Sequence, residues 1–301
     1  MEQEQKYNDL LEILKGELII LPDKSEENAR NTLHALWHTA FGNRVSAILA
    51  EQIELPVLQL HHFLVLDEYL KERLSGVPLA HLTERQHFLG MDFILNKGLY
   101  IPRKETELLA KTAIDTIKKE FEELTSVNII DLCTGIGTVA LAIGYYCKNT
   151  FVYGSDIFEP AIIAAKINVK HFSLENRVSF YHANLFDPFE SLSFKNKTHI
   201  IVCAPPYISS LKVKQMPLEI SNHEPSEAFD AGPYGLSIFS KLISKAPQYL
   251  CKNGYLIFEC GLGQGEFLAN RMITNEHYGN ISKICDENGN VRVIKAKMVR
   301  E

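Results

Sequence analysis

The sequence lacks the features that mark secreted and membrane proteins. Its first residues, MEQEQKYNDL, are polar and include no apolar signal segment, and no apolar run approaches the roughly 18 residues of a membrane helix. We therefore expect a cytoplasmic protein that makes no use of a membrane. The six cysteines are scattered, with no CxxC pair and no Cys/His cluster. This pattern predicts reduced core thiols and no metal site.

A strong charge bias and internal repeats are also absent. The chain has 31 basic and 37 acidic residues, which give a net charge of −6. Such a balance is a poor basis for neutralising a phosphate backbone, so we expect no direct nucleic-acid partner. What is present is ample apolar material: 46% of 301 residues are hydrophobic, enough for one large or two smaller globular domains.

The N-terminal part has helical periodicity. The segment EENARNTLHALWHTAF places Leu33, Leu36 and Trp37 on one face, and VLDEYLKERLSG repeats the pattern before Gly76. Residues 1–85 are therefore expected to form a small helical bundle. The next stretch, HFLGMDFILNKGLYI, is rich in aromatic and aliphatic residues around an Asn-Lys-Gly turn, so residues 86–104 are expected to form a β-hairpin linker.

From residue 105 to 301, strand-like and helix-like segments alternate. Alternation of this kind predicts right-handed β-α-β units and an α/β domain with a mainly parallel, Rossmann-like sheet covered on both faces. The C-terminal segment ISKICDENGNVRVIKAKMV differs, because it contains two strands joined at Glu-Asn-Gly. This pair is expected to be antiparallel and to close one edge of the sheet.

The first chemical motif is NIIDLCTGIGTVALAI, residues 128–143, in which a strand ending at Asp131 leads into a turn and a helix. The turn contains Thr134, Gly135 and Gly137, and glycine lets a ligand approach the backbone closely. An ordinary strand-to-helix turn would look similar. The next strand adds Asp156, 19 residues beyond Gly137, at about the separation expected for a carboxylate that binds ribose hydroxyls.

The turn does not form a complete dinucleotide fingerprint. DLCTGIGT lacks the GxGxxG pattern and has no basic residue placed for a pyrophosphate. A nucleoside with an amino-acid tail fits better, and S-adenosylmethionine is such a ligand. The third strand is expected to end at Asn184 and Leu185, where Asn184 would meet the adenine amino group and Leu185 would flank the ring; Asn184 could equally be a plain turn residue at the strand end.

A proline corner ends the fourth strand, in IVCAPPYIS. Neither Pro205 nor Pro206 can continue a strand ladder, so the chain must turn there. At the carboxyl end of a central strand, this corner is expected to face the reactive sulfonium. Proline carbonyls could accept hydrogen bonds from a planar amine or amide, and Tyr207 could stack on a flat substrate. A strand terminator with an incidental tyrosine is the alternative.

These motifs make the chain resemble the HemK-type class I methyltransferases, which modify the glutamine of peptide-chain release factors at N5. The resemblance includes GVPLAHLTERQHFLGMDF, IPRKETELL, DLCTGIGTVALAI, HEPSEAFDAGPYGLSIFSKLI and LIFECGLGQGE. It implies a seven-stranded sheet, S-adenosylmethionine as methyl donor, and a release-factor loop presented between a substrate-recognition domain and a cofactor-binding domain. It also implies that Arg103 and Glu105 close the cofactor pocket near its methionyl end; a surface salt bridge that contributes little stability is the alternative for this pair.

One residue departs from this family. Its corner reads Asn-Pro-Pro-Tyr, and this chain has Ala204 at the asparagine position. Three explanations are open: an introduced substitution in a glutamine methyltransferase, a natural relative acting on a better nucleophile, or a protein that binds the cofactor without turning it over. The second includes small-molecule acceptors, and attack by the cofactor's own α-amino group to close an azetidine ring.

Overall fold

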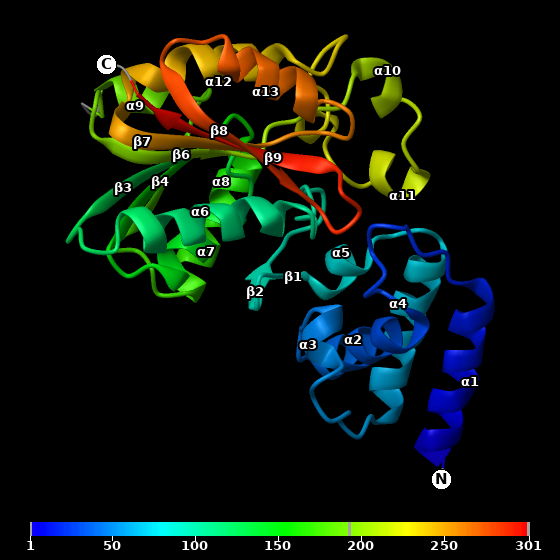
Figure 1. The fold of residues 1–301 in the computed structure, drawn as a ribbon. Coiled ribbons are helices and arrows are strands. Elements are labelled where there is room, and N and C mark those ends of the chain that lie inside the picture. The colour runs from blue at the N-terminus through cyan, green and yellow to red at the C-terminus, as the bar shows by residue number, and fades with distance from the viewer. Residues whose placement is uncertain (1, 192–193, 300–301) are drawn as a thin grey trace. The chain divides into compact units, whose positions relative to one another are not determined.

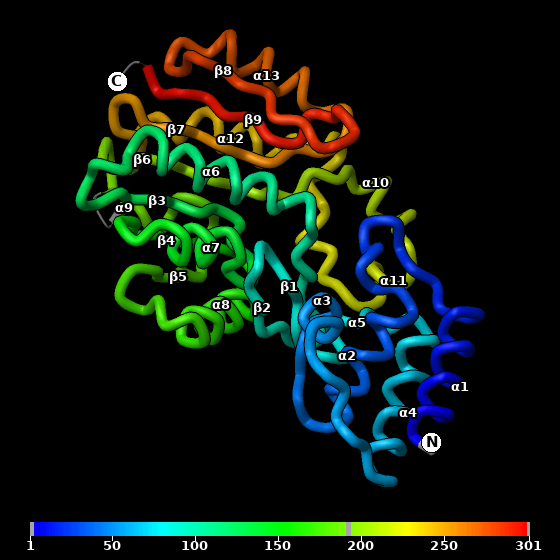
Figure 2. Tube along the Cα trace, turned by 60° about the horizontal axis from the view of Figure 1, so that its bottom comes forward, coloured from blue at the N-terminus to red at the C-terminus, as the bar shows by residue number. Residues whose placement is uncertain are grey.

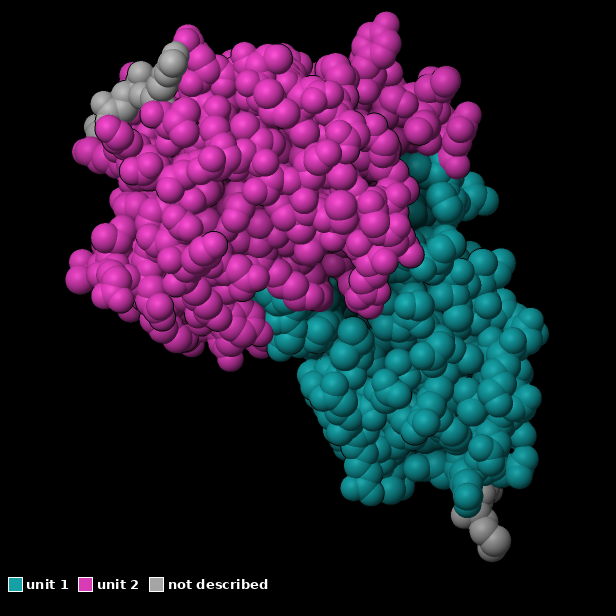
Figure 3. All heavy atoms as spheres, viewed as in Figure 1, with its two compact units in different colours: residues 1–102, 216–225 teal, residues 103–215, 226–301 magenta. Residues whose placement is uncertain are grey.

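The computed structural model describes residues 2–191 and 194–299, which divide into two compact units (Figure 3). Unit 1 comprises Met1–Pro102 and Met216–Pro225, and unit 2 comprises Arg103–Gln215 and Ser226–Glu301. The chain therefore starts in unit 1, continues into unit 2, returns to unit 1 for the ten residues Met216–Pro225, and ends in unit 2. Within the described ranges, no helix has both the length and the apolar character needed to cross a membrane. The roles expected for residues 1–85, 86–104 and 105–301 remain predictions.

Unit 1 contains the predicted helical bundle. Leu33, Leu36 and Trp37 are completely buried on one face of α2, as their spacing predicts. Asn28 caps this helix by accepting a hydrogen bond from the Asn31 amide. The helices of this unit are α1 (Glu2–Glu17), α2 (Ala29–Phe41), α3 (Ala47–Ala50), α4 (Leu60–Leu74), α5 (Leu79–Thr83) and α11 (Leu218–Ser221).

Unit 1 also contains the predicted β-hairpin, but its turn is elsewhere. Strands β1 (Arg85–Phe88) and β2 (Met91–Ile94) pair antiparallel, with Phe88 opposite Met91. The connection is therefore Leu89-Gly90, and the predicted turn at Asn-Lys-Gly is wrong. Both connecting residues have positive φ, 49° and 77°, as the favoured two-residue hairpin turn requires. The Asn-Lys-Gly segment instead bends the chain after β2 has ended.

Unit 2 is built on one seven-stranded sheet. Figure 2 shows the strands in the order β5-β4-β3-β6-β7-β9-β8, and all neighbours are parallel except the pairs that involve β9. The expected antiparallel pair closes the edge and turns at residues 286–290. The strands are β3 (Val127–Leu132), β4 (Thr150–Asp156), β5 (Val178–His182), β6 (Thr198–Cys203), β7 (Leu250–Glu259), β8 (Tyr278–Cys285) and β9 (Val291–Met298).

Helices cover both faces of this sheet, as the alternating pattern predicts. Figure 1 shows α6 and α7 on one face and α12 and α13 on the other. Alternate strand residues such as Ile130, Leu132 and Phe258 are buried in the core cluster that includes α12 and α13. The helices are α6 (Thr106–Glu120), α7 (Thr138–Tyr146), α8 (Glu159–His171), α9 (Asp187–Ser191), α10 (Ser210–Val213), α12 (Ser237–Lys245) and α13 (Gly265–Ile273), with 3-10 turns at Ser226–Ala228 and Ala246–Gln248.

The strand order creates a switch point beside β3. The chain runs from β3 outward through β4 to β5 on one side, and resumes on the other side with β6. Leu132, at the end of β3, pairs with Ser155 of β4 and with Cys203 of β6. The glycine turn, Asp156 and Ala204 therefore all follow paired residues at the same carboxyl edge. In open α/β sheets, this is the place where ligands bind.

Candidate active site

The side chain of Asp131 stabilises the glycine turn after β3 by hydrogen bonds to both ends of the turn. This carboxylate is 1% exposed, and its Oδ2 accepts hydrogen bonds from the Thr134 hydroxyl at 2.5 Å and from the Ala140 amide at 3.2 Å. Asp131 and Thr134 thus lie at the start of the glycine turn, and the Asp131 carboxylate links this start to the N-terminal end of α7. Their contacts fix the backbone that a ligand would meet.

Gly135 and Gly137 are both required in this turn, for different reasons. Gly135 has φ of 55°, and a Cβ added there would meet nothing within 4 Å, so its backbone borders open space. Gly137 has φ of 88°, and an added Cβ would lie 2.6 Å from Cζ of Phe180. Gly137 therefore allows α7 to start against β5, while Gly135 keeps the backbone accessible to a ligand.

Asp156 lies at the end of β4, as predicted, and is joined to the glycine turn. Its Oδ2 accepts the Gly135 amide at 2.8 Å, and its Oδ1 accepts the Phe158 amide at 2.9 Å. The Ile157 amide also donates to this carboxylate, and because a carboxylate has about four lone-pair sites, it can still accept a further donor. The side chain is partly buried, and burial raises its pKa, which these backbone amides oppose. The carboxylate is thereby oriented at the edge where a ribose is expected.

Asn184 and Leu185 lie just beyond β5, which ends at His182. Leu185 is partly buried with φ of 47°, and its carbonyl accepts the Ser155 hydroxyl at 2.7 Å. This bond ties the segment to the end of β4 beside Asp156. Asn184 is exposed. Both predicted residues are therefore at the same sheet edge as the glycine turn.

The buried carboxyl of Asp131 makes the unfolding free energy of the protein depend on pH. Burial raises the pKa of Asp131 to about 7, the nearby Asp156 charge adds to the increase, and the Thr134 and Ala140 donors oppose it. In the unfolded chain the same carboxyl titrates near its ordinary value of about 4. Between these values the folded protein binds more protons than the unfolded one, so its stability falls as pH rises.

We expect Asp131→Asn to remove this dependence. Between pH 5 and pH 8, the wild type should lose roughly 2 kcal/mol more of its unfolding free energy than the variant loses. Urea denaturation of both proteins at the two pH values measures the difference. Equal losses in the two proteins would contradict the assignment of this titration to Asp131.

The proline corner follows β6 directly, as the sequence predicts. Pro205 is buried, while Ala204, Pro206 and Tyr207 are partly exposed. Because Cys203 pairs with Leu132, Ala204 emerges beside the glycine turn. With a methyl group in place of an amide at this position, the side chain of Ala204 offers no hydrogen-bond acceptor. The hydrogen-bond acceptors of the corner are its backbone carbonyls and the hydroxyl of Tyr207.

Three residues hold Tyr207, and the sequence did not single out two of them, Gln264 and Arg292. Its hydroxyl donates to Oε1 of Glu259 at 3.1 Å and accepts from Nη2 of Arg292 at 3.3 Å. Nε2 of Gln264 donates to its backbone carbonyl at 3.0 Å. Glu259 ends β7, where its side chain could be expected either to close the pocket or only to lead from the sheet into the next helix. The one sequence feature that pointed to this region was the segment LIFECGLGQGE, which contains Gln264 and is part of the family resemblance.

The other candidates separate into two groups. Glu105 is the N-cap residue of α6, and its charge is close enough to affect the pKa values of Glu259 and Arg292, so it belongs with the corner. Arg103 lies in the turn just before α6. Glu224, by contrast, is buried in unit 1, where it accepts the Ile101 amide at 2.8 Å. This contact gives Glu224 a structural role within unit 1.

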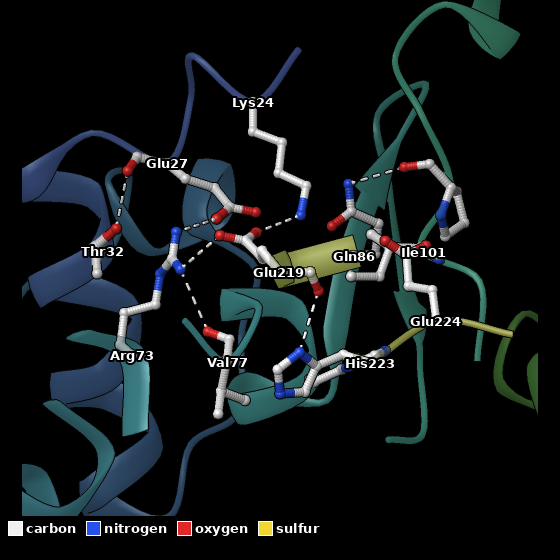
Figure 4. Close-up of polar contacts among 12 residues, drawn as sticks. Lys24, Glu27, Thr32, Arg73, Val77, Gln86, Ile101, Glu219, His223 and Glu224 are labelled. Carbon is white, nitrogen blue, oxygen red and sulfur yellow. Dashed lines mark hydrogen bonds and ion pairs between the residues drawn. The ribbon is translucent and has the colours of Figure 1, made fainter. Parts of the chain in front are cut away.

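Unit 1 contains a separate buried network of four charges (Figure 4). Arg73 donates to Oε2 of Glu27 and to Oε2 of Glu219, both at 3.1 Å, and Nζ of Lys24 donates to Oε1 of Glu219 at 2.8 Å. Burial raises the pKa of Glu27; for Glu219 burial acts in the same direction, but the Lys24 and Arg73 charges lower its pKa. Two cations and two carboxylates balance here, so the network is structural.

Comparisons with known proteins agree with this geometry. The methyltransferase small domain family matches residues 105–220. A release factor glutamine methyltransferase from Rhodopirellula baltica is 32% identical over 231 residues, covering 75% of this chain and 76% of the relative. One from Bacillus cereus is 29% identical over 273 residues, covering 91% and 93%.

The chain belongs to the release factor glutamine methyltransferase family. It is thus an enzyme of the S-adenosylmethionine-dependent methyltransferase class, as its motifs predict. Among solved structures, the hMettl16 catalytic domain in complex with MAT2A 3′UTR hairpin 6 has a TM-score of 0.51 at 13% identity. That likeness covers 68% of this chain and 74% of the other, and it confirms the class I methyltransferase fold.

Proposed function

We propose that this methyltransferase transfers a methyl group to the side-chain amide of a glutamine in a peptide-chain release factor, and that Ala204 slows the reaction. The supporting observation is the Ala204–Tyr207 corner, which follows β6 at the same sheet edge as the glycine turn and Asp156. The names of its relatives support the choice of acceptor. No direct nucleic-acid or membrane partner is part of this proposal.

The residues at the edge fit S-adenosylmethionine. Gly135 leaves its backbone open, Asp156 can still accept a further donor such as a ribose hydroxyl, and Leu185 is placed to flank a base. We assign Arg103 and Glu105 to the methionyl end and Asn184 to the adenine. When bound, the cofactor supplies an electrophilic methyl on a sulfonium.

The corner residues would orient the acceptor. An amide nitrogen is a poor nucleophile because its lone pair is delocalised, so the enzyme must hold it in line with the methyl. The backbone carbonyl at Pro205 can accept one amide hydrogen, and the ring of Tyr207 can stack on the amide plane. The second acceptor that an asparagine side chain would provide is missing. Turnover on glutamine is therefore expected, but at a reduced rate.

Isothermal titration calorimetry tests the cofactor assignment. We expect S-adenosylmethionine to bind at micromolar concentrations and NAD not to bind, because the turn lacks the glycines and the basic residue suited to a pyrophosphate. Asp156→Ala should weaken binding by about tenfold or more, since it removes the carboxylate that accepts ribose hydroxyls and orients Gly135. A preference for NAD would overturn the assignment.

The missing amide also favours a second candidate, a reaction on a small-molecule nucleophile. A free amine does not need two carbonyl acceptors to expose its lone pair, so Ala204 would cost such a reaction little. The cofactor's own α-amino group is one such nucleophile, and its attack on the side chain would close an azetidine ring with release of methylthioadenosine. Incubation with the cofactor alone, followed by mass spectrometry, distinguishes this candidate.

A further inference from the structure

The backbone of Tyr207 is held by the turn at residues 261–264. Gln264 donates to the Tyr207 carbonyl at 3.0 Å, and the Gly261 amide donates to Oε1 of Gln264 at 2.9 Å. A Cβ added at Gly261 would lie 2.8 Å from Cδ2 of Tyr207, and one added at Gly235 would lie 2.5 Å from the Tyr207 carbonyl oxygen. The glycines therefore let the tyrosine backbone and ring pack at distances that any larger residue would prevent.

The hydroxyl of Tyr207 is fixed by two charged residues from neighbouring strands. Glu259 ends β7, Arg292 is the second residue of β9, and the two strands pair at this point. Their side chains are only 3% and 9% exposed, and the guanidinium carbon lies 6.0 Å from the centre of the tyrosine ring. The hydroxyl thus has a buried acceptor and a buried donor at the same time.

The ion pair itself is poorly arranged for stability. Nη2 of Arg292 lies 3.6 Å from Oε1 of Glu259, whereas a bidentate pair would place two nitrogens against two oxygens. In the described part of the chain, Oε2 of Glu259 and Nε of Arg292 are buried without a hydrogen-bond partner, although the Thr106 side chain also hydrogen-bonds to the Glu259 carboxyl. A pair selected only for stability would satisfy these atoms. What the observed geometry does achieve is two contacts with one hydroxyl.

We propose that Glu259 and Arg292 are positioning residues, which act through the hydroxyl of Tyr207 to hold its ring in one orientation at the reaction corner. The proposal rests on the proposed function, in which that ring stacks on the acceptor. It further implies that the hydroxyl, already engaged on both sides, takes no part in proton transfer. The contribution of Tyr207 is then the orientation of its ring, which matters more because Ala204 supplies no acceptor.

A double-mutant cycle tests whether the pair acts through the hydroxyl. In the Ala204→Asn background, we expect Tyr207→Phe and Arg292→Met each to lower kcat by about tenfold, with unchanged cofactor affinity by calorimetry. The double variant should be no slower than Tyr207→Phe alone, because the contact is already lost. Glu259→Gln, which keeps an acceptor oxygen, should lose less than Arg292→Met. If the kcat of the double variant fell by the product of the two single losses, the proposal would be overturned.

A spectroscopic test does not depend on any reaction. In protein labelled with 3-fluorotyrosine, the Tyr207 fluorine resonance is identified by its absence from Tyr207→Phe. We expect Arg292→Met to shift or broaden this resonance, and the exposed matched control Arg271→Met to leave it unchanged. An unchanged resonance in Arg292→Met would overturn the positioning role. Failure of methyl transfer with a shifted resonance would contradict only the proposed function.

Discussion

Replacing Ala204 by asparagine is expected to raise the rate of methyl transfer to a release-factor glutamine by on the order of a hundredfold. The substitution supplies a side-chain carbonyl at the start of the corner, beside the carbonyl of Pro205. An unpaired N–H on the acceptor costs about 1–3 kcal/mol, and deleting one preorganised polar partner in other enzymes costs about 10²–10³ in kcat. Rates are measured with a purified release factor, by transfer of a labelled methyl group.

A variant of similar size separates the amide from the volume that it adds. Ala204→Leu fills about the same space as asparagine but provides no acceptor, so it should not accelerate the reaction. If Ala204→Asn were no faster than the native protein, the glutamine proposal would fail. Release of methylthioadenosine without any acceptor would then favour the cyclisation, and tight cofactor binding with no product would favour a non-catalytic binder.

Replacing Arg73 by methionine is expected to destabilise unit 1 by about 3–5 kcal/mol. The guanidinium side chain is 1% exposed and pairs with Glu27 and Glu219, which are 5% and 9% exposed. Its removal leaves two buried carboxylates with Lys24 as the remaining partner in the network. Breaking a buried pair by removing one partner has this large cost because the other charge stays buried without compensation. Urea denaturation measures the change.

The matched control is Lys15→Met, which removes a cation from an exposed pair. Lys15 lies 2.8 Å from Glu12, and both side chains are more than half exposed. Such pairs contribute about 0–1 kcal/mol, so this variant should unfold almost as the wild type does. Limited trypsin digestion gives a second readout, since Lys212 and Lys214 precede the segment that Glu219 anchors. Equal stability of the two variants would show that the buried network contributes little.

Local patterns predicted most of the methyltransferase unit. Apolar strands with helical segments between them specified the order of the elements, and residues at the strand ends, such as Asp156, lie at the edge where they were expected. The hairpin turn was wrong for a physical reason. Asn-Lys-Gly is the stronger turn signal, but the chain turns one strand earlier through Leu89, a residue that rarely adopts positive φ.

The partners of Tyr207 were not predictable in the same way. Glu259 and Arg292 meet because β7 pairs with β9, and this register depends on the whole sheet. Gln264 reaches the tyrosine carbonyl across 57 residues of sequence. Likewise, Arg73 and Glu219 are 146 residues apart, and nothing in the local sequence of either indicates the other. Single-sequence periodicity identifies elements and strand ends, whereas such contacts depend on tertiary packing.

The discontinuous make-up of unit 1 has a consequence for its biosynthesis. When the ribosome has produced Met1–Pro102, Lys24 and Arg73 have Glu27 as their only carboxylate partner in this network, because Glu219 has not yet been translated. More than a hundred further residues must therefore be synthesised before Glu219 can pair with the buried Lys24 and Arg73 of the nascent helical bundle. An excised N-terminal fragment would retain that imbalance permanently, so the bundle is expected to mature only together with the sheet that is translated after it.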